Sequence, residues 1–230
     1  MTRSSAISRR RRGRFIVLEG IDGAGTTTQS RLLCDWLRSI GRSVLPTREP
    51  SDGPIGHMIR AILSGRLVVR ESVAAGSPRV RALDPAAIAL LFAADRIDHL
   101  DNEVQPALAR GIEVVSDRYY HSSLAYQSQD CPMPWVQQIN RRAMAPDVTY
   151  LLDVPVCVGA RRRRARLGRD LFENDAFQIR VERSYRSLRR LLPEEDIVVL
   201  DGTRSVEEIQ SRIQHDLILR FGWKIAPRRG

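Results

Sequence analysis

The stretch that most restricts how this chain can fold is GIDGAGTTTQ, residues 20–29. It joins the apolar run 14–19 (RFIVLE) to a helical pattern over 27–40. Its three glycines let backbone N–H groups turn inward, and the first helical turn adds free amides and the positive end of the helix dipole. A strand, a glycine-rich turn and a helix in this order predict a phosphate-binding loop. Thr26 stands where that pattern has lysine, so the stretch alone is also compatible with an ordinary strand-to-helix turn.

The alternation of strand and helix patterns predicts the rest of the fold. Strand character is found at residues 14–19, 43–48, 112–117, 148–153 and 196–200. Most of these runs are continuously apolar, as expected for parallel strands that helices cover on both faces. Helical patterns lie at 27–40, 55–63, 85–100, 135–145, 178–192 and 206–220. This order predicts an α/β fold with a doubly wound sheet. Residues 67–84 lack clear periodicity and are expected to form a long surface excursion.

The formal charge of +10 is concentrated in two places. Residues 1–14 contain six arginines and no acid, and residues 161–169 contain six more. Nucleic-acid binders generally spread basic residues over a face and add stacking aromatics, which both clusters lack, so we expect no nucleic-acid partner. Residues 1–13 are expected to form a disordered, solvated tail before a single domain over 14–230. A transit peptide and the start of a twin-arginine signal are alternatives for this tail.

The spacing of the cysteines and the length of the apolar runs indicate the cellular compartment of the protein. Cys34, Cys131 and Cys157 lie far apart with no CxxC pair, which is unlike a disulfide framework or a zinc site and fits a reducing cytoplasm. The longest apolar run, residues 86–94, is far shorter than the ~20 residues that a membrane-spanning helix needs. We therefore expect a cytoplasmic protein with no membrane segment.

Three further stretches carry a family resemblance: TREPSDGPIGHMIR (47–60), LLFAADRIDHLDNEVQPALARGIEVVSDRYYHSSLAYQ (90–127) and APDVTYLLDV (145–154). Together with the loop at 20–29, they resemble thymidylate kinases from about residue 14 to about residue 220, in the family's order and near its spacing. The resemblance implies a P-loop kinase fold around a five-stranded parallel sheet. It also implies transfer of the γ-phosphate of ATP onto dTMP with Mg²⁺, giving dTDP for dTTP synthesis, and a homodimer.

The resemblance assigns the phosphate side of the site to the loop and to the end of the strand 112–117. The residues expected to bind the ATP phosphates are Gly20, Ile21, Asp22, Gly23, Ala24, Gly25, Thr26, Thr27 and Thr28. Mg²⁺ is expected at Thr27 and Asp117, partly through water, and Asp22 is expected to help place the acceptor and the metal. Thr203 and Arg204 resemble the segment beside the adenine, although a turn before a capped helix gives the same letters.

The dTMP side is assigned to the ends of two strands and to the helix 85–100. Arg48 and Arg118 match the arginines that hold the acceptor phosphate, and Arg118 is also a catalytic candidate. Their places at strand ends favour this independently, because ligands of open α/β sheets bind at the carboxyl ends of strands. The resemblance places Phe92 against the thymine ring and Arg96 at a base carbonyl, and the two share a helix face. The remaining dTMP contacts that it implies are Ser123, Tyr126 and Gln127.

The second arginine cluster lies where related kinases carry a mobile lid, at about residues 160–173. Its catalytic candidates are Arg161, Arg162, Arg163, Arg164 and Arg166, with Arg169 beyond them. The sequence does not select one of these, but their charges could offset the missing lysine at position 26 by reaching the same phosphates.

Two rival functions remain open. One is a non-catalytic nucleotide-binding protein with this fold, and the other is a kinase for a different nucleotide.

Overall fold

Five parallel strands form the central sheet of the molecule. The computed structural model describes residues 12–71, 79–167 and 175–223. The strands of this sheet are β1 (Phe15–Glu19), β2 (Val44–Arg48), β5 (Glu113–Asp117), β6 (Val148–Asp153) and β7 (Ile197–Asp201). They pair in the order β2-β5-β1-β6-β7, and all four neighbouring pairs are parallel. The predicted α/β fold is confirmed, and each strand lies within one residue of its expected range.

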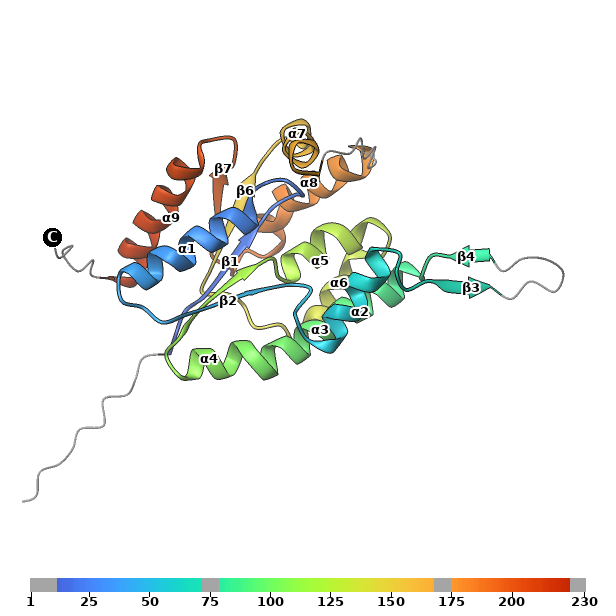
Figure 1. Cartoon of the computed structure of the whole chain (residues 1–230), viewed down its shortest axis with the longest axis horizontal. Helices are drawn as coiled ribbons and strands as arrows, with labels where there is room; N and C mark the ends of the chain where they lie inside the picture. Colours follow the sequence, from blue (N-terminus) through green and yellow to red (C-terminus); the bar gives the residue numbers. More distant parts are fainter. Residues whose placement is uncertain (1–11, 72–78, 168–174, 224–230) are drawn as a thin grey trace, which may run out of the picture.

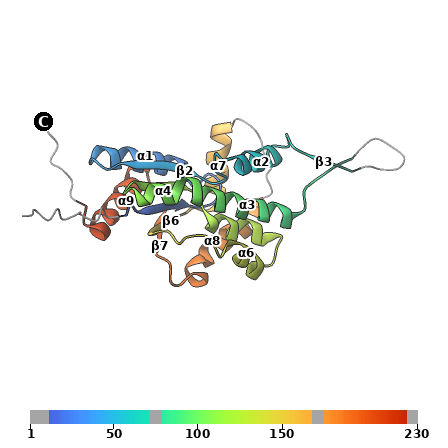
Figure 2. The same ribbon diagram turned by 90° about the horizontal axis from the view of Figure 1, so that it is seen from below.

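Helices lie on both sides of this sheet (Figures 1 and 2). They are α1 (Thr26–Ser39), α2 (Pro54–Leu63), α3 (Pro85–His99), α4 (Gln105–Ala109), α5 (Tyr120–Tyr126), α6 (Met133–Asn140), α7 (Val156–Leu167), α8 (Asp175–Leu191) and α9 (Val206–Phe221). A π-helical turn, η1 (Leu100–Val104), joins α3 to α4, and a 3-10 turn, η2 (Gln127–Gln129), follows α5. Helix α1 packs on β1, β2 and β5 and against α9, whereas α5 packs against α8.

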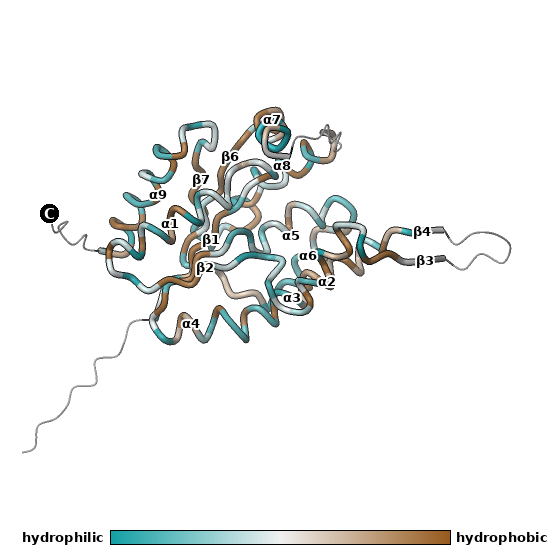
Figure 3. The backbone as a smooth tube through the Cα atoms, in the orientation of Figure 1, coloured by the Kyte–Doolittle hydropathy of each residue, from teal (hydrophilic) through white to brown (hydrophobic). Residues whose placement is uncertain are grey.

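The core follows from the apolar composition of the central strands. All five residues of β1 are buried, and Val114 and Val115 of the neighbouring β5 are fully buried. Leu33 and Leu37, one turn apart on α1, are fully buried as well. Each apolar side chain among these contributes ~1.5–3 kcal/mol on burial. Figure 3 shows hydrophobic colour along these strands and hydrophilic colour along much of α7. The strand ends that lead into the site therefore stand on a rigid support.

The expected surface excursion at 67–84 contains regular structure. Its described residues form an antiparallel pair, β3 (Val69–Glu71) with β4 (Arg79–Arg81), and this hairpin projects from the body of the molecule (Figure 1). Two three-residue strands are too short to show an alternating pattern, which explains why the sequence did not reveal them.

Two helix ends differ from expectation. Helix α6 ends at Asn140, five residues before the expected end at 145. The helix expected to end at residue 100 instead continues through η1 into α4. Pro106 has no N–H and its ring crowds the carbonyl four residues earlier, which accounts for the wider hydrogen-bonding of η1 just before it. Helices α5 and α7 were not among the expected elements.

The N-terminal boundary is described only in part. Residues 1–11 of the expected tail lie outside the described residues, as do 72–78, 168–174 and 224–230. Within the described part, Arg12 Nη1 lies 3.3 Å from a carboxylate oxygen of Asp147, and the Gly13 N–H donates to the carbonyl of Leu108. Among the described helices, none has the length and hydropathy needed to cross a lipid bilayer.

Candidate active site

The glycine-rich loop lies between β1 and α1, as the sequence predicts. Gly25 is the N-cap of α1 with φ 102°, and Gly23 has φ 85°, a region that favours glycine. A Cβ on Gly23 would lie 2.4 Å from the carbonyl oxygen of Gly159 in α7, so the loop packs directly on the backbone of that helix. Thr26 is the first residue of α1 and is buried. In the described part of the chain no side chain caps α1, which leaves its first amides available to an anion.

Arg118 meets Asp22 of the loop although the two are 96 residues apart in the chain. Its Nη2 donates to Asp22 Oδ1 at 2.6 Å, and its Nη1 donates to Ser122 Oγ and to the Tyr185 hydroxyl, each at 3.2 Å. Burial alone would lower the pKa of Arg118, but Tyr126, Tyr185 and Asp22 hold it above its usual value. The backbone of Arg118 has φ 74°, which is uncommon for a residue with a side chain. The contacts on both terminal nitrogens hold this guanidinium against the loop.

Glu19, the last residue of β1, is fully buried beneath this contact and was not predicted as a site residue. Its carboxylate accepts the Tyr119 backbone N–H at 2.7 Å, Ser122 Oγ–H at 2.8 Å and the Tyr185 hydroxyl at 2.9 Å. Burial raises the pKa of Glu19 by more than its polar neighbours lower it. Glu19 thus fixes both side chains that contact Arg118 Nη1. The available signal was an acid at the end of an otherwise apolar strand.

Thr27 and Asp117 come together at the start of α1 and the end of β5. Thr27 Oγ1 donates to Asp117 Oδ2 at 2.5 Å. The other carboxylate oxygen, Asp117 Oδ1, is buried and has no hydrogen-bond partner within the described residues. Both residues line a cavity of about 330 Å³ together with Arg48. Arg48 Nη2 donates to Asp52 at 2.7 Å and lowers the pKa of that carboxyl, but its side chain stays 57% exposed and open to a ligand.

The base-side candidates Phe92 and Arg96 lie on α3 with very different burial. Phe92 is half-buried and is not part of the core formed by the described residues. Arg96 is 2% exposed, and its guanidinium donates to Glu49 Oε2, Ser123 Oγ and Asn140 Oδ1. Of these partners only Ser123 was predicted. The structure therefore brings Arg96 and Ser123 together and leaves the ring of Phe92 outside the core.

Tyr126 and Gln127 follow at the end of α5. The Arg118 guanidinium carbon lies 5.4 Å from the centre of the Tyr126 ring. The Tyr126 hydroxyl and Gln127 Oε1 are both buried and lack hydrogen-bond partners in the described part of the chain. Burial raises the pKa of Tyr126 well above its ordinary value, so it is a neutral donor. Unpaired buried polar atoms of this kind are suited to a polar ligand.

The predicted lid is a helix over its first part. Arg162 Nη1 donates to the Ala24 carbonyl at 3.2 Å, and Arg163 Nη1 donates to the Asp22 carbonyl at 2.6 Å. Arg161 and Arg164 are exposed on the other sides of α7. Arg166 belongs to α7 but its side chain is outside the described residues, and Arg169 lies outside them altogether. Two of the candidate arginines thus reach the loop.

The turn after β7 holds Thr203 and Arg204. Both bind Asp201, the last residue of β7: Thr203 Oγ1 at 2.5 Å and Arg204 Nε at 3.0 Å. Gln29 of α1 donates to the Val206 carbonyl at 2.9 Å and so attaches this turn to the helix that follows the loop. The predicted adenine-side residues therefore lie next to α1 and are exposed.

Comparison with known proteins agrees with this arrangement. The profile of the family described as thymidylate kinase matches residues 18–213. The chain belongs to the thymidylate kinase family. The probable thymidylate kinase of Pyrococcus horikoshii is 41% identical over 213 residues, which cover 90% of this chain and 98% of the relative. The probable thymidylate kinase of Thermococcus kodakarensis is 40% identical over 86% of this chain and 94% of its own length. The thymidylate kinase of Nostoc sp. is 38% identical over 89% and 95%.

The metal-side residues of this thymidylate kinase family member fit a magnesium ion. A hydroxyl from Thr27 and the unpaired Oδ1 of Asp117 are the hard oxygen ligands that Mg²⁺ takes. Among the described residues, no group of three or more His, Cys, Asp or Glu side chains forms a separate metal centre. An ion at this place would therefore share its remaining ligands with phosphate and water, which is how Mg²⁺ is usually held beside nucleotides.

Proposed function

We propose that this chain transfers the γ-phosphate of ATP to dTMP and releases dTDP. The observation that carries the proposal is the family membership over nearly the whole chain, with relatives named thymidylate kinase. The positions of Asp22, Arg48 and Arg118 support it, because the candidate loop and both candidate acceptor arginines lie at the carboxyl edge of the sheet. For dTTP synthesis the product would then need one further phosphorylation.

The chemistry asks the protein mainly for positioning and charge neutralisation. The amides of residues 20–28 would hold the ATP phosphates, and Arg48 and Arg118 would hold the acceptor phosphate in fork geometry. Mg²⁺, held by Thr27 and Asp117, would supply charge neutralisation between the phosphates. Asp22 would keep Arg118 over the loop through the 2.6 Å contact described above. Thr203 and Arg204 would lie beside the adenine.

The lid arginines supply a reason why Thr26 is compatible with activity. Arg162 and Arg163 already touch the carbonyls of Ala24 and Asp22 and need only turn their guanidinium groups to face a phosphate in the loop. They would provide the positive charge that a loop lysine provides elsewhere, in a site from which the closed lid excludes water. Arg161, Arg164 and Arg166 would add to the same field.

Recognition of thymine would fall to Phe92, Arg96 and Ser123, with Tyr126 under the sugar and Gln127 beside it. The ring of Phe92, which is half-buried and outside the core of the described residues, would stack on the base, and the bulk of Tyr126 would exclude a ribose 2′-hydroxyl. By family resemblance we also propose a single kinase domain over 14–230, a homodimer and a cytoplasmic location. The scattered cysteines are in keeping with a reducing compartment.

The test is direct. Purified protein is incubated with ATP, Mg²⁺ and dTMP, dUMP or UMP, and the diphosphate products are separated by ion-exchange chromatography. We expect dTMP to be the best acceptor. The missing methyl of dUMP should cost ~1 kcal/mol of packing, and UMP should react far more slowly because of its 2′-hydroxyl. Equal turnover of UMP and dTMP would contradict the assignment. Tight dTMP binding with no product would instead favour a non-catalytic nucleotide-binding protein.

A further inference from the structure

Arg118 adopts a backbone conformation that a residue with a side chain takes up only when its surroundings impose it. Its φ of 74° lies in the left-handed region, and among the described residues it is the only residue besides glycines with a positive φ. It directly follows β5 and precedes Tyr119, the extended N-cap residue of α5. The conformation of this one residue therefore sets the direction in which its side chain leaves the end of the strand.

The peptide group before the Cα of Arg118 is held by the backbone of neighbouring strands. Its carbonyl, that of Asp117, accepts the Glu49 N–H at 3.2 Å, and its N–H, that of Arg118, donates to the Leu18 carbonyl at 2.9 Å. Leu18 lies in β1 and Glu49 directly follows β2. Because both partners are backbone groups, this half of the turn depends little on which side chains are present.

The peptide group after the Cα of Arg118 is held by two side chains. Its carbonyl, that of Arg118, accepts the Ser116 hydroxyl at 2.7 Å, and its N–H, that of Tyr119, donates to Glu19 Oε1 at 2.7 Å. Ser116 and Glu19 are both fully buried, so water cannot replace either contact. A peptide group that is bound at both ends does not rotate. The ψ angle of Arg118 is therefore fixed by Ser116 and Glu19.

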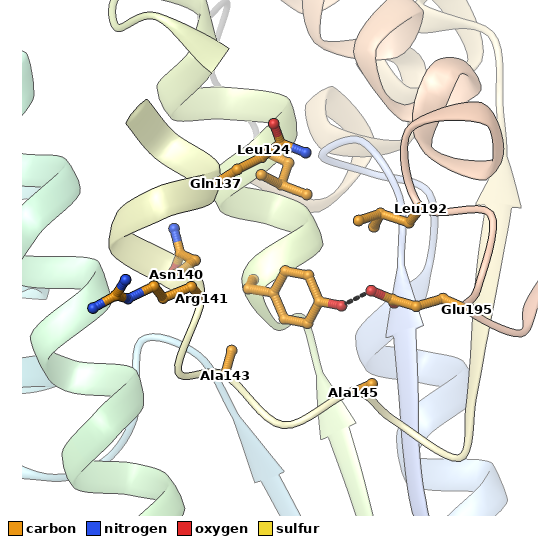
Figure 4. Close-up of a pocket in the computed structure, with 9 residues that line it drawn as sticks. Leu124, Gln137, Asn140, Arg141, Ala143, Ala145, Leu192 and Glu195 are labelled. Carbon is orange, nitrogen blue, oxygen red and sulfur yellow. Dashed lines mark hydrogen bonds between the residues drawn. The ribbon is translucent and has the colours of Figure 1, made fainter. Parts of the chain in front are cut away.

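The start of α5, beyond this turn, is anchored separately. His121 Nε2 lies 2.8 Å from Glu195 Oε2, and the Tyr120 hydroxyl donates to the other oxygen of the same carboxylate. Glu195 lines a cavity of about 220 Å³ between α5, α6 and the segment before β7, with Asn140 on the opposite side (Figure 4). Because Glu195 holds the first residues of α5, a change at Ser116 should act on Arg118 and leave the helix in place.

We propose that Ser116 is a positioning residue for Arg118, which holds the carbonyl of its strained backbone and so keeps the guanidinium directed at the acceptor phosphate. Asp22 binds the far end of the arginine, whereas Ser116 sets the direction in which the side chain begins. The Arg118 side chain is 21% exposed, so a ligand can reach it. Without the Ser116 hydroxyl the carbonyl loses its partner, and the peptide can rotate toward a conformation that is usual for arginine. The proposal rests on the proposed function, in which Arg118 binds the acceptor phosphate.

The test measures how much the phosphate group contributes to binding. Calorimetry without ATP or Mg²⁺ gives the Kd of dTMP and of thymidine, which lacks the phosphate, and the ratio of the two reports that contribution. We expect Ser116→Ala to weaken dTMP binding about three- to tenfold, the effect of one lost hydrogen bond, and to leave thymidine binding unchanged. Ser187→Ala on α8 is the matched control, because that hydroxyl also donates to a backbone carbonyl at 2.7 Å, and it should match wild type.

A double-mutant cycle separates positioning from a general structural role. If Ser116 acts through Arg118, Ser116→Ala should change dTMP affinity no further in an Arg118→Ala background. Ser116→Thr and Ser116→Val have the same shape and differ only in the hydroxyl. The threonine variant should bind dTMP as tightly as wild type, and the valine variant as weakly as Ser116→Ala. This pair replaces the alanine variant if circular dichroism shows that it does not fold.

Three results would overturn the inference: unchanged dTMP affinity in a folded variant without the hydroxyl, an equal loss of dTMP and thymidine binding, or a full effect of Ser116→Ala in the Arg118→Ala background. Phosphate transfer to dTMP by wild type is measured separately and tests the proposed function. Transfer by wild type with any of these three results would contradict the inference alone. A phosphate contribution that depends on Ser116 in a protein that transfers no phosphate would support the inference and contradict the proposed function.

Discussion

At the scale of single residues, Arg48 and Arg118 illustrate two ways of presenting a cation to a phosphate. Arg118 is held by the loop on one side and by Ser122 and Tyr185 on the other. Among the described residues, the Arg48 side chain binds only the exposed carboxylate of Asp52, a contact of the kind worth about 0–1 kcal/mol. A phosphate can therefore displace Asp52 at little cost, whereas Arg118 is oriented in advance.

Removing either arginine should impair turnover. Arg48→Ala and Arg118→Ala should each lower kcat/KM for dTMP by on the order of 10²-fold, because a charge-assisted fork to the acceptor phosphate is lost. Steady-state kinetics measures the effect, and circular dichroism checks the fold. Arg212→Ala, on the exposed side of α9, is the matched control and should be neutral. Near wild-type kinetics in both variants would mean that the acceptor pocket lies elsewhere.

Thr26 and the lid arginines should behave as one unit. Arg162→Gln with Arg163→Gln should lower kcat by about 10²-fold, because two charges near the phosphates are lost. Adding Thr26→Lys should restore part of the rate in that background and change little in wild type. Such non-additivity is read from a double-mutant cycle.

The control for this cycle is the pair Arg161→Gln with Arg164→Gln, which changes the same charge on exposed sides of α7. It should cost much less than the inner pair. A nearly inactive wild type that Thr26→Lys strongly activates would contradict the idea, because the loop itself would then have lost its chemistry.

The residues proposed for the site could be named from sequence motifs, whereas the residues that support them could not. Asp22 and Arg118 belong to motifs that can be recognised along the chain. Tyr185 could not be inferred, and Glu19 gave only the signal of an acid at the end of an apolar strand, because their roles depend on a contact between positions 166 residues apart. Phe92 would have been taken for a core residue from hydropathy alone, and only the packing of α3 leaves its ring outside the core.

At the scale of elements, the junction of loop and lid helix leaves no room for a side chain at Gly23 or at Gly159. The strands were predictable because most of them bury a continuous apolar run. Helix α7 is rich in arginine, and its role as a lid was proposed from its position directly after β6. Helix α7 approaches the loop through the backbone of Gly159 and Gly23, a contact that hydropathy patterns do not predict. The described part of the lid thus contacts the loop through this backbone approach and through the hydrogen bonds of Arg162 and Arg163.

Adding one methyl group at this junction should be harmful. In Gly159→Ala the new Cβ would lie 2.8 Å from the Asp22 carbonyl oxygen, so α7 must shift away from the loop. That shift would also break the contact of Arg163 with the same carbonyl. We expect kcat to fall about tenfold or more, with dTMP affinity nearly unchanged. Ala165→Ser, exposed on the same helix, should have no comparable effect in the same kinetic and calorimetric measurements.

At the scale of the whole molecule, all five parallel strands end on a charged residue at one edge of the sheet. These residues are Glu19, Arg48, Asp117, Asp153 and Asp201. Each binds the segment that follows a strand or a helix packed nearby. The buried strands stabilise the fold, and their charged last residues bind the segments that carry the candidate site residues. The apolar core therefore also positions the site.

The free energy of unfolding should depend on pH through Asp216 of α9, which binds Tyr150 of β6. Tyr150, fully buried, donates to Asp216 Oδ2 at 2.6 Å. Burial alone would raise the pKa of Asp216, but hydrogen bonds from Arg220 and Tyr150 bring it below its ordinary 3.8. A lowered pKa gives stability that is present above the ordinary value and is lost as pH falls through the folded value. Tyr150→Phe should therefore lower the free energy of unfolding by about 1 kcal/mol at pH 7.

Urea unfolding measures this difference as a function of pH. The gap between wild type and Tyr150→Phe should stay constant from neutral pH down to the region of the ordinary carboxyl pKa and then narrow as Asp216 takes up its proton. A gap that widens on acidification would show that the hydroxyl stabilises the fold by another route.

The close approach of Gly23 and Gly159 also limits how this junction can change in evolution. Both residues already lack a side chain, so no smaller residue at one position could make room for a larger residue at the other. Two successive point changes starting at either glycine pass through an intermediate whose first added carbon meets a carbonyl oxygen. A lineage that alters this junction must therefore insert or delete residues around it. Divergence should then be recorded as changes in the length of the segments that lead into and out of α7.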